Sequence, residues 1–201
     1  GTDSGSNQIS GGERAILALS KLYYDFDTTA DTDTSVTIDG QSDLSSSGDA
    51  VIESSSVDDP VATTVAVNYA GTSKITGNIL AHGGGSVEIA PQADAGTVTV
   101  NGNLLSYDVS GDYAYYRNNY HGGTIDMSLT SGSVMTGMAD TGVIGSTNGI
   151  GVINLAMAGT AVWRMTTSSA VTNLSGDGGT VHFVNGGDSL QITGSVSGSH
   201  T

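Results

Sequence analysis

The chain has 201 residues, of which 37% are hydrophobic and 12% are charged, and 20 acidic residues against 5 basic ones give a net charge of −15. This balance excludes a nucleic-acid-binding surface, which needs clustered Lys and Arg, and it disfavours binding to anionic membranes. Cysteine is absent, so disulfides and thiolate metal sites are excluded too.

The N-terminal part is acidic, with twelve of the 20 acids before residue 61. Residues 1–6, GTDSGS, resemble a serine-protease signature interrupted by a threonine, but no histidine lies nearby in the sequence, so we expect no catalysis there. Residues 13–26 lack a helical apolar period, which favours strands around a turn, with a short helix as the alternative.

The acidic segment 25–39 contains five aspartates: Asp25, Asp27, Asp31, Asp33 and Asp39. Calcium sites need several oxygens converging from one loop. The EF-hand spacing fails here, because the glycine at the sixth loop position and the closing glutamate are missing. We expect a solvated loop, and a weak calcium site is the alternative.

Short strand signals follow, each β-branched or alternating between apolar and polar residues. They cover 35–38, 50–53, 64–69, 74–80, 86–90 and 97–105. Gly, Asn, Asp or Ser marks each break. Asn101–Gly102 is the strongest hairpin signal in the chain.

Residues 112–123, DYAYYRNNYHGG, hold half of the chain's tyrosines: Tyr113, Tyr115, Tyr116 and Tyr120. Tyrosine offers contact area with a polar tip, which suits recognition of carbohydrate or protein. The alternative is a loop whose rings pack on the fold. His82 and His182 lack metal-ligand spacing, so we expect solvent-facing or turn positions and no metal site.

Two internal similarities indicate the fold. Residues 12–16 resemble 48–51, and residues 124–135 align without a gap on 152–163, so that Met135 falls on Trp163. A further shift of about 28 residues would bring Val152 near Thr180–Val181. Short-strand repeats of this size predict an all-β solenoid, a parallel β-helix, with a β-sandwich as the alternative.

The C-terminal pattern is more specific. It consists of 152–155 (VINL), Trp163, 169–174 (SAVTNL) and 178–183 (GGTVHF). This pattern resembles the C-terminal passenger region of bacterial autotransporters, the pertactin-like and AIDA-type adhesins, whose last coils carry an autochaperone segment. Met135 departs from the aromatic often found in the preceding coil, and 112–123 has no counterpart.

The resemblance implies a right-handed parallel β-helix, periplasmic transit, secretion through the outer membrane and display at the bacterial cell surface. It implies passenger coils over 1–123 and autochaperone-like coils of the same solenoid over 124–201. The residues that it assigns to folding are Trp163, Leu174, Gly178, Gly179, Val181 and Phe183. The polar ends of the chain lead us to expect a piece of a longer protein.

A solenoid benefits from one coil that is more stable than the rest, because each coil contacts only its neighbours and non-local pairing is slow. Trp163 and Phe183 lie 20 residues apart, and we expect them to stack or to cap the interior one coil apart. Gly178–Gly179 would supply a turn with positive φ.

The sequence thus predicts a structural stalk and folding template of a surface adhesin, without enzyme activity, cofactor, metal or direct membrane insertion. Its expected partners are a host surface protein or glycan, or a second copy through self-association, and not nucleic acid. The alternative is a β-helix carbohydrate-active enzyme or polysaccharide-binding module, which paired carboxylates or stacked aromatics in a groove would favour.

Overall fold

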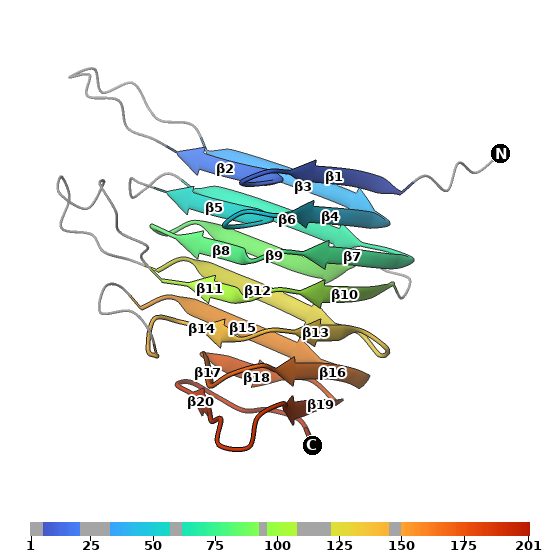
Figure 1. The fold of residues 1–201 in the computed structure, drawn as a ribbon, viewed down its shortest axis with the longest axis vertical. Helices are drawn as coiled ribbons and strands as arrows, with labels where there is room; N and C mark the ends of the chain where they lie inside the picture. Colours follow the sequence, from blue (N-terminus) through green and yellow to red (C-terminus); the bar gives the residue numbers. More distant parts are fainter. Residues whose placement is uncertain (1–5, 21–32, 57–61, 93–95, 108–121, 145–149) are drawn as a thin grey trace.

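The chain forms a solenoid of parallel β-strands stacked coil upon coil (Figure 1). The computed structural model describes residues 6–20, 33–56, 62–92, 96–107, 122–144 and 150–201. Within these ranges the chain has no helix, and every pair of strands is parallel. Parallel pairing throughout rules out the β-sandwich alternative, whose sheets are antiparallel.

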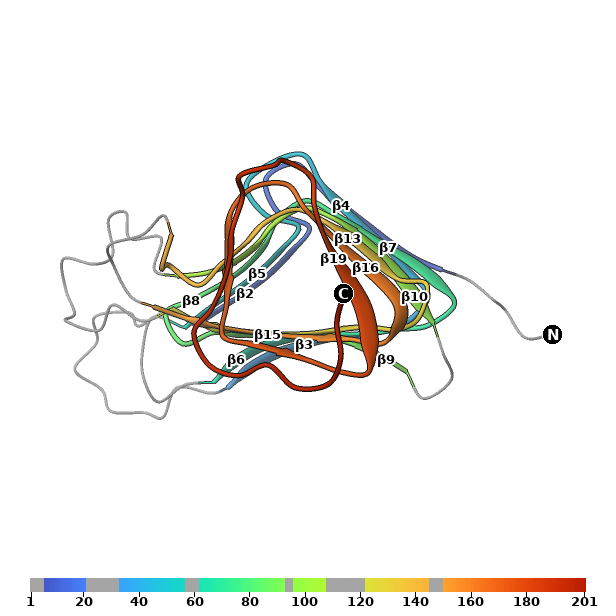
Figure 2. The ribbon, with the colours of Figure 1, turned by 90° about the horizontal axis from the view of Figure 1, so that it is seen from below.

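Three sheets form the three faces of a triangular prism (Figure 2). Face A contains β1 (Asn7–Gly11), β4 (Ser42–Ser46), β7 (Thr72–Thr76), β10 (Thr97–Asn101), β13 (Val134–Thr136), β16 (Gly159–Met165) and β19 (Gly178–Phe183). Face B contains β2 (Ile16–Ser20), β5 (Ile52–Ser56), β8 (Ile79–His82), β11 (Leu104–Ser106) and β14 (Ala139–Asp140). Face C contains β3 (Thr34–Gly40), β6 (Thr63–Tyr69), β9 (Ser86–Pro91), β12 (Thr124–Leu129), β15 (Val152–Met157) and β18 (Asn173–Ser175). A fourth sheet pairs β17 (Ser169–Val171) with β20 (Leu190–Ile192), below β14 of face B.

The solenoid is right-handed. Figure 2 views it from below, where the chain advances toward the reader. In that view the chain passes from face A to face B and then to face C in a counter-clockwise sense. This is the hand that parallel crossover connections almost always adopt. The sequence-based prediction of a right-handed parallel β-helix is therefore confirmed.

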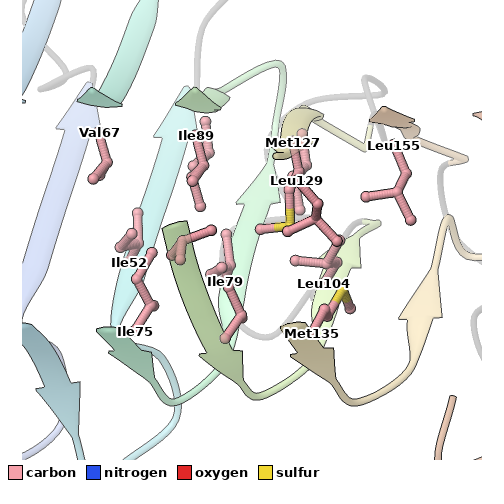
Figure 3. Close-up of a cluster of buried hydrophobic side chains, with 14 of the residues drawn as sticks. Ile52, Val67, Ile75, Ile79, Ile89, Leu104, Met127, Leu129, Met135 and Leu155 are labelled. Carbon is pink, nitrogen blue, oxygen red and sulfur yellow. The ribbon is translucent and has the colours of Figure 1, made fainter. Parts of the chain in front are cut away.

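Inward side chains form a continuous apolar core. On face A one inward column consists of Leu44, Ile75, Val100, Met135 and Trp163, all fully buried. Figure 3 shows Val67, Ile89, Met127 and Leu155 of face C pointing toward inward residues of the other two faces. Because strand side chains alternate, each inward column has an outward column beside it. The outward columns are mostly polar on faces A and C, whereas face B places Leu17, Leu80 and Leu105 in register with Glu53.

The corner between faces A and B is built from stacked glycines. A Cβ on Gly102 would lie 2.0 Å from the carbonyl oxygen of Gly77, and a Cβ on Gly137 would lie 2.0 Å from that of Gly102. Asparagines follow two of these glycines. The Oδ1 atom of Asn78 accepts a hydrogen bond from the backbone of Asn103 at 3.1 Å, one coil on. The corner requires glycine because successive coils approach there too closely for a side chain.

The predicted strands match the structure with two differences. The segments at 74–80 and 97–105 each form two strands on different faces, because a glycine corner interrupts each of them. The hairpin signal at Asn101–Gly102 corresponds to a corner of the solenoid, since this pair joins β10 of face A to β11 of face B. Of residues 13–26, β2 accounts for Ile16–Ser20, and 21–26 lie outside the described residues.

The longer internal repeat is confirmed residue by residue. Ile125 pairs with Ile153, and Met135 pairs with Trp163, as the ungapped alignment predicts. The similarity between 12–16 and 48–51 also corresponds to adjacent coils, because β2 pairs with β5. The further shift of about 28 residues is wrong, because Trp163 pairs with Val181. The last connections are short, and this coil therefore needs fewer residues.

Candidate functional site

Trp163 lies inside the solenoid, on the inward side of β16. It is fully buried, and its Nε1 atom donates a hydrogen bond to the backbone oxygen of Gly137 at 3.0 Å. Met135 lies above it in the column and Val181 below it. Burial with a satisfied indole N–H makes Trp163 a core residue that links β16 to the corner of the preceding coil.

Phe183 does not stack on Trp163. It pairs in register with Met165, near the end of β16, and 43% of it is exposed. The partly buried Val181 occupies the position below Trp163 instead. The expected stacking or capping of the interior by this aromatic pair is therefore wrong, because the offset between these two coils is 18 residues rather than 20.

The remaining residues assigned to folding lie around the same coils. Leu174 is 4% exposed and pairs with Leu155 in the core. Gly178 and Gly179 have φ values of 120° and 83°, which confirms the predicted positive-φ geometry. A Cβ on Gly178 would lie 2.6 Å from backbone atoms of Gly159, so glycine is needed there for space as well.

The four predicted contact tyrosines, Tyr113, Tyr115, Tyr116 and Tyr120, lie outside the described residues. The described ends of their connection are β11 and β12, which belong to faces B and C. The tyrosine hypothesis stays a prediction.

The acidic segment is described only at its end. Asp33 accepts a hydrogen bond from the backbone N–H of Ala62 at 3.0 Å, and Asp39 accepts one from the side chain of Asn68 at 2.8 Å. Asp25, Asp27 and Asp31 lie outside the described residues. Within the described part of the chain, no three His, Cys, Asp or Glu residues are grouped to hold a metal ion.

A charged cluster on face B, the Arg14–Glu53–His82 cluster, is absent from the sequence-based prediction. The Nε atom of Arg14 donates a hydrogen bond to Glu53 Oε2, and Nε2 of His82 lies 3.0 Å from Glu53 Oε1. The three residues come from three successive coils: Arg14 precedes β2, Glu53 lies on β5 and His82 ends β8. The side chain of His82 is 17% exposed and its backbone oxygen accepts the N–H of Gly85 at 2.9 Å, so of the two predicted settings the turn fits this residue better than a solvent-facing position.

Electrostatics in this cluster favour the ionised carboxylate. The hydrogen bond to His82 lowers the pKa of Glu53, burial opposes this by raising it, and the hydrogen bond and charge of Arg14 lower it further. The hydrogen bond to Glu53 in turn raises the pKa of Arg14. The carboxylate is therefore anionic at neutral pH and holds cationic or donor groups from the coils on both sides of it.

The cluster has the composition of an acid–base pair, but its surroundings favour a structural contact. Ser55, the register partner of His82, is 3% exposed, and Glu53 is 6% exposed. A reacting substrate would need access to both Glu53 and His82.

His182 lies apart from this cluster. It is exposed on β19, as predicted.

The outward side of face C carries a ladder of polar side chains, the face C ladder. Asn154 donates to Asp126 at 2.7 Å, Asn173 donates to Asn154 at 2.7 Å, and Ser195 donates to Asn173 at 2.8 Å. Four successive coils are thus joined through side chains. The ladder covers the face with polar groups that are already bonded to one another.

Comparisons with protein-family models, with curated proteins and with solved structures find no match to this chain. In the part of the chain that the structure describes, no helix is long and apolar enough to cross a membrane.

Proposed function

We propose that the chain is a rigid stalk and folding template of a surface-displayed adhesin of the autotransporter passenger type. The observation that carries this proposal is the column of Met135, Trp163 and Val181 in a continuous solenoid core. The pattern that resembles an autochaperone segment places its tryptophan in that column. There the tryptophan is buried inside its coil, which is where a residue that stabilises a template coil would lie.

The outward surface supports a role as a stalk. The face C ladder engages the side chains of Asp126, Asn154 and Asn173 with one another. Face A presents Lys74, Thr99 and other mostly polar residues outward between its buried columns. On faces A and C the described outward residues are mostly polar, as a spacer between two sites needs, whereas face B exposes Leu17 and Leu19.

The last coils support a role as a template. Trp163 and Met135 are fully buried, Val181 is partly buried, and β16 pairs with strands on both sides. A partly folded solenoid ends in an unpaired strand edge. The next coil can pair with that edge only if the coil that carries it is already folded. Coils formed at 124–190 would provide it for the coils before them.

The alternative function, a carbohydrate-active β-helix, needs two carboxylates or stacked aromatics in an open groove. Of the two carboxylates that the structure places against Arg14, Glu53 is buried and Glu13 lies 3.7 Å from the guanidinium with its side chain exposed, so the two do not share an open groove. The described surface therefore favours the stalk.

Limited proteolysis with mass spectrometry of the fragments tests the template. We expect a resistant core that contains residues 124–190, together with early cleavage in the N-terminal coils. Resistant N-terminal coils with a digested C-terminal part would contradict the proposal.

Refolding after dilution from denaturant separates a template from ordinary core packing. Trp163→Ala should slow refolding of the whole chain more than Met135→Ala does, although both residues are fully buried in one column. Equal refolding rates for the two variants would mean that the coil of Trp163 has no special role.

Adhesion is tested by displaying the chain on bacterial cells and measuring clumping and binding to host cells. A variant with Tyr113, Tyr115, Tyr116 and Tyr120 all changed to serine should lose both while keeping the far-ultraviolet spectrum of the folded chain. Unaltered clumping and binding would remove the tyrosines from the proposal.

A further inference from the structure

Two Asn–Gly pairs in the described residues differ in their surroundings: Asn101–Gly102 and Asn185–Gly186. Asn–Gly is the dipeptide in which the backbone nitrogen of glycine attacks the asparagine side chain most readily, because glycine has no side chain to obstruct it. The reaction needs freedom of the glycine N–H and of the backbone around it. The hydrogen bonds around each pair show which glycine has that freedom.

Asn101–Gly102 is held in the corner between β10 and β11. The N–H of Gly102 donates to the backbone oxygen of Thr136 at 3.0 Å, and the backbone oxygen of Asn101 accepts a hydrogen bond from Gly77 at 2.9 Å. Neighbouring coils thus fix both residues from above and below. The nitrogen that would have to attack is already engaged and cannot turn toward its own side chain without opening the corner.

Asn185–Gly186 lies in the turn between β19 and β20, with both residues exposed. Among the described residues, the N–H of Gly186 has no backbone acceptor. A Cβ built on Gly186 would meet nothing within 4 Å. The side chain of Asn185 is oriented by one contact, donated from Nδ2 to the backbone oxygen of Thr166 at 2.7 Å at the exposed surface.

We propose that Asn185–Gly186 is a self-modification site in the last coil. The Gly186 nitrogen forms a bond to Cγ of Asn185 while the Cγ–Nδ2 bond breaks, and ammonia leaves with the proton of the backbone amide. The product is a five-membered succinimide. Water then adds to one of its two carbonyls and opens the ring to aspartate or to isoaspartate.

Either product changes this turn. A carboxylate replaces the amide that donates to Thr166, so that contact is lost and a negative charge is added near Asp188. Isoaspartate also lengthens the backbone by one methylene group. The turn ends in hydrogen bonds from Val184 to Met165 and from Ser189 to Ser168, which the longer backbone would strain. The site is thus a slow chemical switch that loosens the last coil.

Ageing of the folded chain at mildly alkaline pH, followed by peptide mapping, tests the proposal. The peptide with Asn185 should gain the mass that exchange of an amide for a carboxylate gives, and an isoaspartate-specific methyltransferase should label it. Asn101 should react at least about tenfold more slowly, the factor that a local opening cost of ~1.4 kcal/mol imposes. In denaturant both sites should react, because the corner no longer protects Asn101.

Gly186→Ala is the matched variant, since the added methyl has open space and Gly186 does not adopt a positive φ. It should fold normally and lose the modification at residue 185. An unmodified Asn185 in the aged folded chain, equal rates at 101 and 185, or an undiminished rate in the alanine variant would each overturn the proposal. None of these results depends on adhesion or on template-assisted folding.

Discussion

The first coils and the last coils of the solenoid are joined by different chemistry. Arg14 and His82 connect the first three coils through hydrogen bonds to the buried carboxylate of Glu53. Trp163 and the amide contacts of the face C ladder connect the last ones. Charged contacts respond to pH and salt, whereas apolar packing and amide contacts respond much less. One fold therefore has an environment-sensitive end and an insensitive end.

The largest loss of stability is expected in the last coils, the end that is insensitive to pH and salt. Trp163→Ala removes a fully buried indole and its hydrogen bond to Gly137, and should lower the free energy of unfolding by about 3–5 kcal/mol. Equilibrium denaturation followed by circular dichroism measures this. The control is Arg164→Ala, an exposed neighbour on the same strand, which should change stability by less than about 0.5 kcal/mol.

Glu53→Gln should have the next largest effect, at the sensitive end. It removes the charge that Arg14 and His82 share and should destabilise the first coils by about 2 kcal/mol, the usual size for a hydrogen bond to a charged group. Hydrogen exchange should show the loss in β2, β5 and β8. Glu88→Gln removes an exposed carboxylate from face C and serves as the control. Equal effects of the two substitutions would show that the buried cluster contributes nothing.

At acidic pH, the wild-type chain and Glu53→Gln should have the same free energy of unfolding. The pKa of Glu53 is lowered in the folded chain, so its contribution is present above the ordinary glutamate pKa of 4.5 and is lost as pH falls through the lower, folded-state value. The gap in unfolding free energy between the two proteins should therefore close below about pH 4.5. A gap that stays constant with pH would contradict the assignment.

The smallest expected effect is in the face C ladder. Asn154→Ala breaks contacts to Asp126 and Asn173, and should cost about 1 kcal/mol. The loss should vary little with salt, whereas the effect of Glu53→Gln should shrink as salt rises. Denaturation series at low and high ionic strength compare the two. Equal salt dependence would remove the proposed contrast between the ends of the solenoid.

The sequence was sufficient for the fold because neighbouring coils can be aligned directly. Residues 124–135 pair with 152–163 at one constant offset, so apolar positions match without a gap and the column containing Trp163 is predictable. The prediction failed one coil later, where the offset falls to 18 residues. Connection length sets the register there, and no local pattern encodes it.

The Arg14–Glu53–His82 cluster was not predictable for a related reason. Its members are separated by 39 and 29 residues, and each separation includes connections of different length. The corner at Asn101–Gly102 shows a second limit. Its turn chemistry was recognised, but a hairpin and a solenoid corner use the same residues and differ only in the strands that flank them.

The constant offset between β12 and β15 also concerns how such a chain can change in length. Asp126 and Asn154 occupy equivalent sites on adjacent coils, 28 residues apart. Removal of residues 124–151 would join Gly123 to Val152. On face C, β15 would then pair with β9 in place of β12, with equivalent side chains. Whole coils are thus interchangeable units, and gain or loss of one would alter the length of the solenoid while leaving its cross-section unchanged.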